Sequence, residues 1–353
     1  MIFTLIFMGL ILNVYSQRPS NQDDIDHAGI IVKFKSDLDI NFKESSIEEL
    51  FSHEKLQNIG ERFQPQSIEV TGDILKNNMF ALEFDSSRNV KTLVKKYSKT
   101  NLFEYVEPNY IIRFDLIEDD VKPNINPYGK SSNSSCQSPW GCFTPNDPEF
   151  NDQWALQKIQ MPEAWEIDKG DRSVTVAIID SGLNYMDNDI LFRNWFNTPE
   201  WYSGNNGIDS DNNGYVDDAY GWDFSNDDRI PEDSYGTHGH GTGVASVIGA
   251  RLNNNDGIAG MDKNCKIMPL KAGTYSNIVS AIYYAVNEEV EVINMSFGAN
   301  YNSNILKQAL NNAYNAGVVL VAGSGNDGNS APFYPASYKN VISVGATNEY
   351  DNR

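Results

Sequence analysis

Three short stretches place chemically capable side chains directly after apolar runs. Asp180 closes the run in AIIDSG, His240 stands in GHGTGVAS, and Asn326 follows VVLVAGSG. A carboxylate can orient an imidazole and stabilise its positive charge, and an amide presented by a glycine turn can donate a hydrogen bond to an oxyanion. Each stretch alone also fits a plain structural role, because Asp and Asn are common turn residues. Together the three side chains predict acid–base chemistry at one site.

Two histidines stand one residue apart in GTHGHGTG. His240 leads into VASVIGA, a run suited to a buried helix that would fix the direction of the ring. His238 lies in the glycine loop without such support, and we expect it to have a structural role. A zinc pair is disfavoured, because helical metal histidines stand a turn apart and no Cys or third His lies near.

The elements that must position these side chains are predicted to form a parallel sheet. From about Gln153 onward, short apolar runs without alternation are separated by helical segments such as SNIVSAIYYAV. Such runs are buried on both faces, and the helices between them make right-handed crossovers. Ligands of these sheets bind at the carboxyl ends of the strands. We therefore predict a three-layer α/β domain over residues 150–353, with helices on both faces and the three side chains at one edge.

The residues before this domain divide into three predicted parts. An apolar run from Ile2 to Leu12, with the small Ser16 before Gln17, predicts a signal peptide over residues 1–16 and a secreted protein. Residues 17–115 alternate β-like and helical stretches, which indicates a small α+β domain. Residues 116–149 are rich in Pro, Ser, Asn and Asp and are predicted to form a linker.

Charge and cysteine content exclude some functions. Lys and Arg total 27 against 48 Asp and Glu, and the net charge of -21 disfavours nucleic acid and anionic lipid as partners. The N-terminal apolar run is too short for a permanent membrane anchor. In an exported protein, Cys136 and Cys142 are predicted to form a local disulfide rather than a metal or redox pair. Cys265 lies in an apolar run and is predicted to be a buried thiol.

The order of Asp180, His240 and Asn326 resembles that of the subtilisin-like serine peptidases, the subtilases of peptidase family S8. AIIDSG, GHGTGVAS, INMSFG and AGSGNDG carry the resemblance, which extends from about Asp147 to the end. It implies a secreted endopeptidase in which Asp180 orients the imidazole, His240 takes the proton of the nucleophile, and Asn326 stabilises the oxyanion. It also implies that residues 17–115 are a propeptide, an intramolecular inhibitor that is cut away.

An extended peptide substrate is expected to pair with backbone exposed at two strand ends. The residues concerned are Ser296, Phe297, Gly298, Gly323, Ser324 and Gly325. Two departures from the family's pattern prevent a prediction of substrate specificity. Asp187-Asn188-Asp189 replaces the usual His-Pro-Asp. LKAGTYSNIVSAI is shorter between its strand and its helix than the segment that forms one wall of the substrate cleft in the family.

The nucleophile of the family lies in a GTSMA-like segment, and none occurs among residues 1–353. We expect the chain as given not to hydrolyse peptides, because His240 has no activated hydroxyl to deprotonate. The favoured interpretation is an incomplete copy of a protease. The alternative is an inactive peptide-binding or inhibitory module.

The acidic stretch DSDNNGYVDD predicts a structural calcium ion. Asp209, Asp211, Asn213, Tyr215 through its carbonyl, and Asp217 follow the spacing of a calcium loop. Position 12 is not Glu, so Asp218 or a distant carboxylate would have to complete the site, and a solvated acidic turn is the alternative. A calcium-binding adhesion protein would explain this loop but not the three site residues.

A second, weaker calcium site follows from the resemblance alone. LNNNDGIAG matches a calcium loop of subtilases, with Asn254 and Asp189 as the implied ligands.

Overall fold

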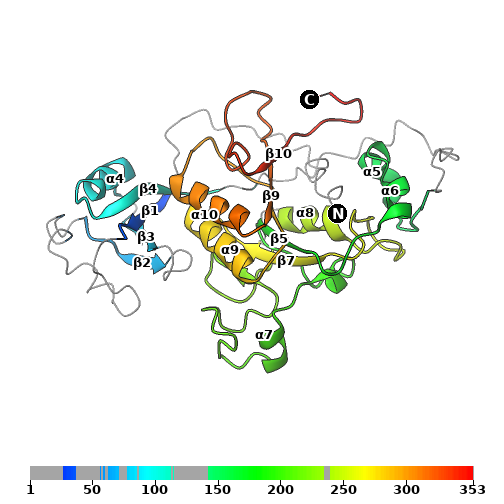
Figure 1. Ribbon diagram of the computed structural model, residues 1–353, viewed down its shortest axis with the longest axis horizontal. Helices are drawn as coiled ribbons and strands as arrows, with labels where there is room; N and C mark the ends of the chain where they lie inside the picture. The colour runs from blue at the N-terminus through cyan, green and yellow to red at the C-terminus, as the bar shows by residue number, and fades with distance from the viewer. Residues whose placement is uncertain are drawn as a thin grey trace.

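The computed structural model contains two sheets, a small antiparallel one and a larger parallel one (Figure 1). The residues that it describes are 27–36, 56, 59, 63–70, 78–85, 87–112, 114, 142–233 and 239–352. The predicted signal peptide, Cys136 and His238 lie outside these residues.

The small sheet has the strand order β2-β3-β1-β4, and each neighbouring pair is antiparallel. Its strands are β1 (His27–Phe34), β2 (Ser67–Val70), β3 (Met79–Glu83) and β4 (Phe103–Tyr110). Helix α4 (Val90–Ser98) covers one face and buries Leu93 and Tyr97 against Phe34, Phe80 and Phe103. Asn89 caps this helix by accepting the backbone N–H of Thr92.

The large sheet has the strand order β10-β9-β8-β5-β7-β6, and every neighbouring pair is parallel. The predicted parallel α/β domain is therefore confirmed. Its strands are β5 (Thr175–Asp180), β6 (Trp222–Asp223), β7 (Lys266–Lys271), β8 (Val292–Met295), β9 (Val319–Gly323) and β10 (Ile342–Val344).

Helices cover both faces of the large sheet, and alternate side chains of β5 pack into two different cores. Ala177 and Ile179 share a core with α9 (Tyr275–Asn287) and α10 (Asn304–Asn315). Val176 and Ile178 share another core with α8 (His240–Gly249). Three short helices, α5 (Trp154–Lys158), α6 (Met161–Ile167) and α7 (Thr198–Ser203), lie outside these layers. Among the described residues, no helix combines the length and apolarity needed to cross a bilayer.

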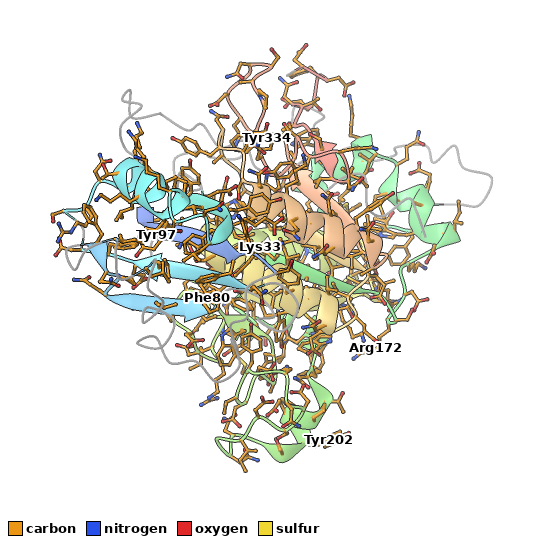
Figure 2. The ribbon with its side chains drawn as sticks, turned by 60° about the vertical axis from the view of Figure 1, so that its left-hand side comes forward. Lys33, Phe80, Tyr97, Arg172, Tyr202 and Tyr334 are labelled. Atoms are coloured by element: carbon orange, nitrogen blue, oxygen red, sulfur yellow. The ribbon has the colours of Figure 1, made fainter. Side chains whose placement is uncertain are left out.

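The small sheet docks on the N-terminal ends of α9 and α10. Glu107 of β4 accepts hydrogen bonds from the Ser303 hydroxyl at 2.7 Å and from the Asn304 backbone N–H at 2.9 Å, both at the start of α10. Asn109 exchanges two hydrogen bonds with Ser276, in the first turn of α9. On β1, Lys33, labelled in Figure 2, donates to a glutamine side chain of α10. The small sheet is thus joined to α9 and α10 by polar contacts, and its Ile31 and Met79 lie in the same apolar core as residues of these helices.

The end of the predicted linker packs against the large domain. The backbone N–H of Phe143 donates to the Pro162 carbonyl, and its ring meets Trp165 edge-on, both on α6. Cys142 is disulfide-bonded, and Cys265 is a buried free thiol.

Candidate active site

The carboxylate of Asp180 and the imidazole of His240 form a buried pair. Asp180 Oδ1 and His240 Nδ1 lie 2.6 Å apart, and the side chains are 0% and 4% exposed. Burial raises the pKa of Asp180 above its usual range, while the hydrogen bond from His240 acts in the opposite direction. A buried carboxylate at this distance holds Nδ1 protonated and leaves Nε2 as the proton acceptor of the ring.

Two glycines allow the segments that carry this pair to meet. Gly241, in the first turn of α8, packs so closely on the turn after β5 that an added Cβ would lie 2.1 Å from the Gly182 carbonyl oxygen and 3.1 Å from Asp180 Oδ1. Gly182 has φ +116° and would place a Cβ 2.5 Å from the Glu232 carbonyl oxygen. Only residues without a side chain fit here, which explains Gly182 in AIIDSG and Gly241 in GHGTG.

The segment that ends at Asp233 connects the turn after β5 to α8 through hydrogen bonds. The Ser181 hydroxyl accepts the Gly241 backbone N–H at 3.0 Å and donates to Asp233 Oδ1 at 2.7 Å. Asp233 Oδ2 accepts the backbone N–H and the hydroxyl of Thr242 at 2.9 and 2.6 Å. Since Gly239 offers no side chain to cap α8, Asp233 takes that role. Asp233 was not predicted from the sequence, because no local motif identifies an acceptor for groups that are distant along the chain.

Asn326 and the predicted substrate-binding residues lie at the same edge as Asp180. The strands β9, β8 and β5 are neighbours and parallel, so their carboxyl ends face one way. Ser296, Phe297 and Gly298 follow β8, while Gly323 ends β9 and precedes Ser324, Gly325 and Asn326. Asn326 is exposed, and Gly325 before it has φ +88°. An amide side chain in this place can donate to a bound carbonyl.

The chain after β4 passes over the buried pair. Ile111 and Thr274 form an antiparallel bridge, and the Ile112 backbone N–H donates to the Gly273 carbonyl at 2.8 Å. The ring of Phe114 lies 5.5 Å from the ring of His240, and it also meets the ring of Phe297 edge-on at 6.0 Å. The extended chain that leaves the small sheet therefore covers His240.

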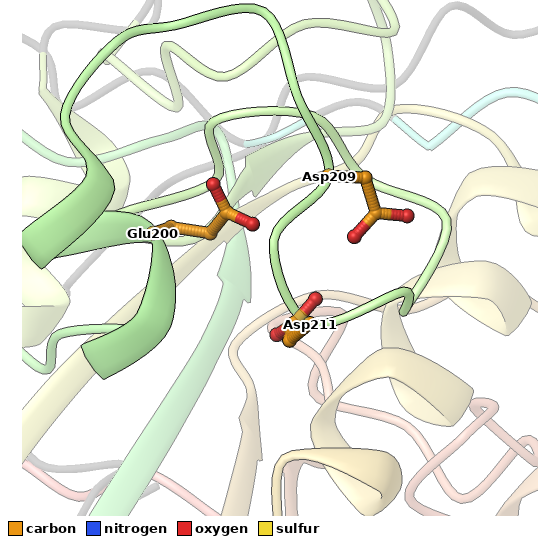
Figure 3. A group of neighbouring side chains, drawn as sticks. All are labelled: Glu200, Asp209 and Asp211. Atoms are coloured by element: carbon orange, nitrogen blue, oxygen red, sulfur yellow. The ribbon is translucent and has the colours of Figure 1, made fainter.

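A group of carboxylates gathers in the insertion between β5 and α8 (Figure 3). Oxygen atoms of Glu200, Asp209 and Asp211 lie within 4.8 Å of one another. Glu200 is 1% exposed, and its Oε2 has no hydrogen-bond partner. A buried carboxylate oxygen without a donor is costly unless a cation compensates it, so these residues suit a hard, oxygen-preferring ion such as Ca²⁺.

Further carboxylates border this group. The Asn213 amide donates to Asp211, Asp218 and Glu288, and the Tyr284 hydroxyl donates to Asp218 at 2.6 Å. Burial raises the pKa of Asp218 to about 6 and that of Glu288 to about 7.

One of the five predicted ligands in this loop, Asp217, binds backbone groups instead. The Asp217 carboxylate accepts the backbone N–H groups of Asn206 and Gly207 at 3.0 and 2.9 Å. The Tyr215 backbone N–H donates to Asn213, and its ring packs edge-on against Trp222; neither contact involves its carbonyl, whose role as a ligand stays a prediction. Glu200 lies on α7, outside the loop motif. It was not predicted, because only the folded chain brings it close to Asp209 and Asp211.

The residues implied for the second calcium site do lie together. The Asn254 amide donates to Asp189 Oδ1 at 2.8 Å, and burial raises the pKa of Asp189. Asp147, which is 3% exposed, accepts the backbone N–H groups of Asn253 and Asn254.

Comparisons with known proteins support the resemblance that the sequence motifs carry. The model of the subtilase family, peptidase S8, matches residues 171–353. A thermophilic serine proteinase of Bacillus sp. strain AK1 is 34% identical over 270 residues, which are 74% of this chain and 54% of that protein. Thermitase of Thermoactinomyces vulgaris is 35% identical over 218 residues, which are 60% of this chain and 68% of thermitase. The chain belongs to the subtilase family, as the sequence motifs predicted.

One solved structure shares the fold across both domains. The crystal structure of fervidolysin from Fervidobacterium pennivorans covers 95% of this chain with a TM-score of 0.57 and 20% identity, and the match spans 45% of fervidolysin. The chain thus spans about half the length of the thermophilic serine proteinase and of fervidolysin.

Proposed function

We propose that this protein is a secreted serine endopeptidase that hydrolyses peptide bonds with an Asp-His-Ser triad. The buried Asp180–His240 pair at the carboxyl edge of the parallel sheet carries the proposal. Asn326 at the same edge supports it, because an acyl-transfer site needs a donor for the oxyanion. The nucleophilic serine is proposed to lie in a GTSMA-like segment, which residues 1–353 do not contain.

In this mechanism His240 moves the proton in both halves of the reaction. Its Nε2 takes the hydroxyl proton as the serine oxygen bonds to the substrate carbonyl, and the Asn326 amide donates to the resulting oxyanion. The imidazolium, stabilised by Asp180, then gives the proton to the leaving amine as the C–N bond breaks. Water releases the acyl group by the same route. Loss of the Asn326 donor is expected to lower kcat by about 10²–10³-fold.

Labelling with a fluorophosphonate tests this assignment on the full-length secreted protein. A His240→Ala variant should lose labelling, because the serine is no longer activated. His238→Ala is the matched control and should keep it. Undiminished labelling of the His240→Ala variant would show that the base is another residue.

The N-terminal domain is proposed to be the inhibitory propeptide of a zymogen. The covering of His240 by Phe114, and the pairing of Ile112 with Gly273, support this role, because a peptide in that position excludes substrate. Glu107 supports it too, since its carboxylate meets the positive end of the α10 dipole.

Calcium is proposed as a structural ion at Glu200, Asp209 and Asp211, with Asp218 close by. The unpartnered Glu200 Oε2 supports this ligand set. When bound, the ion would neutralise the carboxylates and hold the insertion against the sheet. Asp189 and Asn254 are proposed as a second, weaker site.

A further inference from the structure

The aromatic ring of Phe333 fills the space between two strand ends that are proposed to hold substrate. A Cβ added to Gly298 would lie 2.3 Å from Cε1 of this ring. A Cβ added to Gly325 would lie 3.1 Å from its Cγ. The ring therefore stands between the segment after β8 and the segment after β9, in contact with a glycine of each.

The backbone of Phe333 is held in place on both sides. Its N–H donates to the Ser337 hydroxyl at 3.0 Å, and its carbonyl accepts the Ser337 backbone N–H at 2.9 Å. The next residue, Tyr334, exchanges two hydrogen bonds of 2.8 Å with Ala299. Because the chain is fixed at Ser337 and at Ala299, a backbone shift that moved the ring away would break several hydrogen bonds.

The proposed oxyanion donor locates the substrate relative to this ring. Asn326 directly follows Gly325, so a carbonyl bound there belongs to a residue that sits beside the segment after β9. A peptide that also pairs with Ser296–Gly298 runs between both segments. The side chain of the residue before the scissile bond would then enter the gap between Gly298 and Gly325.

We propose, on the basis of the function proposed above, that Phe333 is the specificity-determining residue for this position and restricts it to small side chains. Glycine, alanine and serine fit above the ring, whereas phenylalanine, tyrosine, leucine and methionine need the volume that the ring occupies. Rejection by a filled pocket is an effective way to discriminate among substrates. The substrate class is therefore a polypeptide cut after a small residue.

The test compares two peptides on the full-length secreted protein that differ only in the residue before the cut, alanine or phenylalanine. The wild type should favour alanine in kcat/KM by at least about 10-fold, the range that pocket size supplies. Phe333→Gly should raise the phenylalanine-to-alanine ratio by about 10- to 200-fold. Phe333→Leu should shift it less.

The ratio for two peptides does not depend on how much enzyme is folded, so a destabilised variant still gives an answer. Phe192→Ala is the matched control, because it removes an exposed ring that contacts Arg251, and its ratio should equal that of the wild type. A wild type that prefers phenylalanine, or a Phe333→Gly variant with an unchanged ratio, overturns the inference and leaves the proposed function standing. Failure to cut either peptide overturns both.

Discussion

Removal of calcium is predicted to destabilise the protein through one group of carboxylates. At 4.8 Å, two unit charges repel by about 3 kcal/mol at an effective dielectric constant of 20. Glu200, Asp209 and Asp211 form three such pairs, and a bound cation replaces this repulsion with attraction. Calcium at about 1,000 times its Kd contributes about 4 kcal/mol to the free energy of unfolding. For a domain of this size, that corresponds to a fall in Tm of about 10 °C on chelation.

A variant separates this site from the second one. Glu200→Gln should lower Tm in calcium, because the ion loses a buried ligand, yet leave Tm in chelator equal to or above that of the wild type, because one repelling charge is gone. Asp227→Asn is the matched control, since Asp227 is exposed and Asn tolerates its left-handed backbone with φ 53°. Differential scanning calorimetry with calcium and with chelator measures all four states. Equal chelator-induced shifts in the wild type and in Glu200→Gln would refute the assignment.

Three further predictions concern other parts of the molecule. Glu107→Ala should raise the inhibition constant of the cleaved N-terminal domain by about 10- to 100-fold, because Asn304 and its helix lose a charged acceptor; an unchanged constant would contradict this. Asp233→Ala should lower kcat by about 10- to 100-fold with KM little changed, as steady-state kinetics can show. In chelator, Asp218 and Glu288 have raised pKa values of about 6 and about 7, so the folded protein binds more protons than the unfolded chain. The free energy of unfolding should therefore fall as pH rises from about 4 to about 7, which denaturant titration at several pH values can measure.

The parallel sheet was predictable because its strands are buried on both faces. The apolar runs that end in Asp180 and in Gly323 correspond to β5 and β9. The strands that were missed are short: β6 has two residues and β2 has four. Runs of that length carry no usable period.

The residues of the site were predictable only where a local sequence motif contains them. Asp180 ends β5 and His240 begins α8, and the close packing of these segments requires the nearby Gly182 and Gly241, so the motif and the geometry coincide. Asp233, Glu200 and Phe333 act through contacts across the chain, and no spacing in the sequence identifies them. The calcium prediction shows the same limit, because it assigned Asp217 by position in the loop, whereas that carboxylate binds backbone N–H groups.

Proton NMR of the chain tests the central claim, the buried Asp180–His240 hydrogen bond, without requiring activity. A hydrogen bond of 2.6 Å shielded from water should give a far-downfield resonance for the proton on His240 Nδ1. The account predicts this resonance in the wild type and in His238→Ala, and its loss in Asp180→Asn and in His240→Ala. A wild-type spectrum without it, or one in which Asp180→Asn leaves it unchanged, would contradict the account.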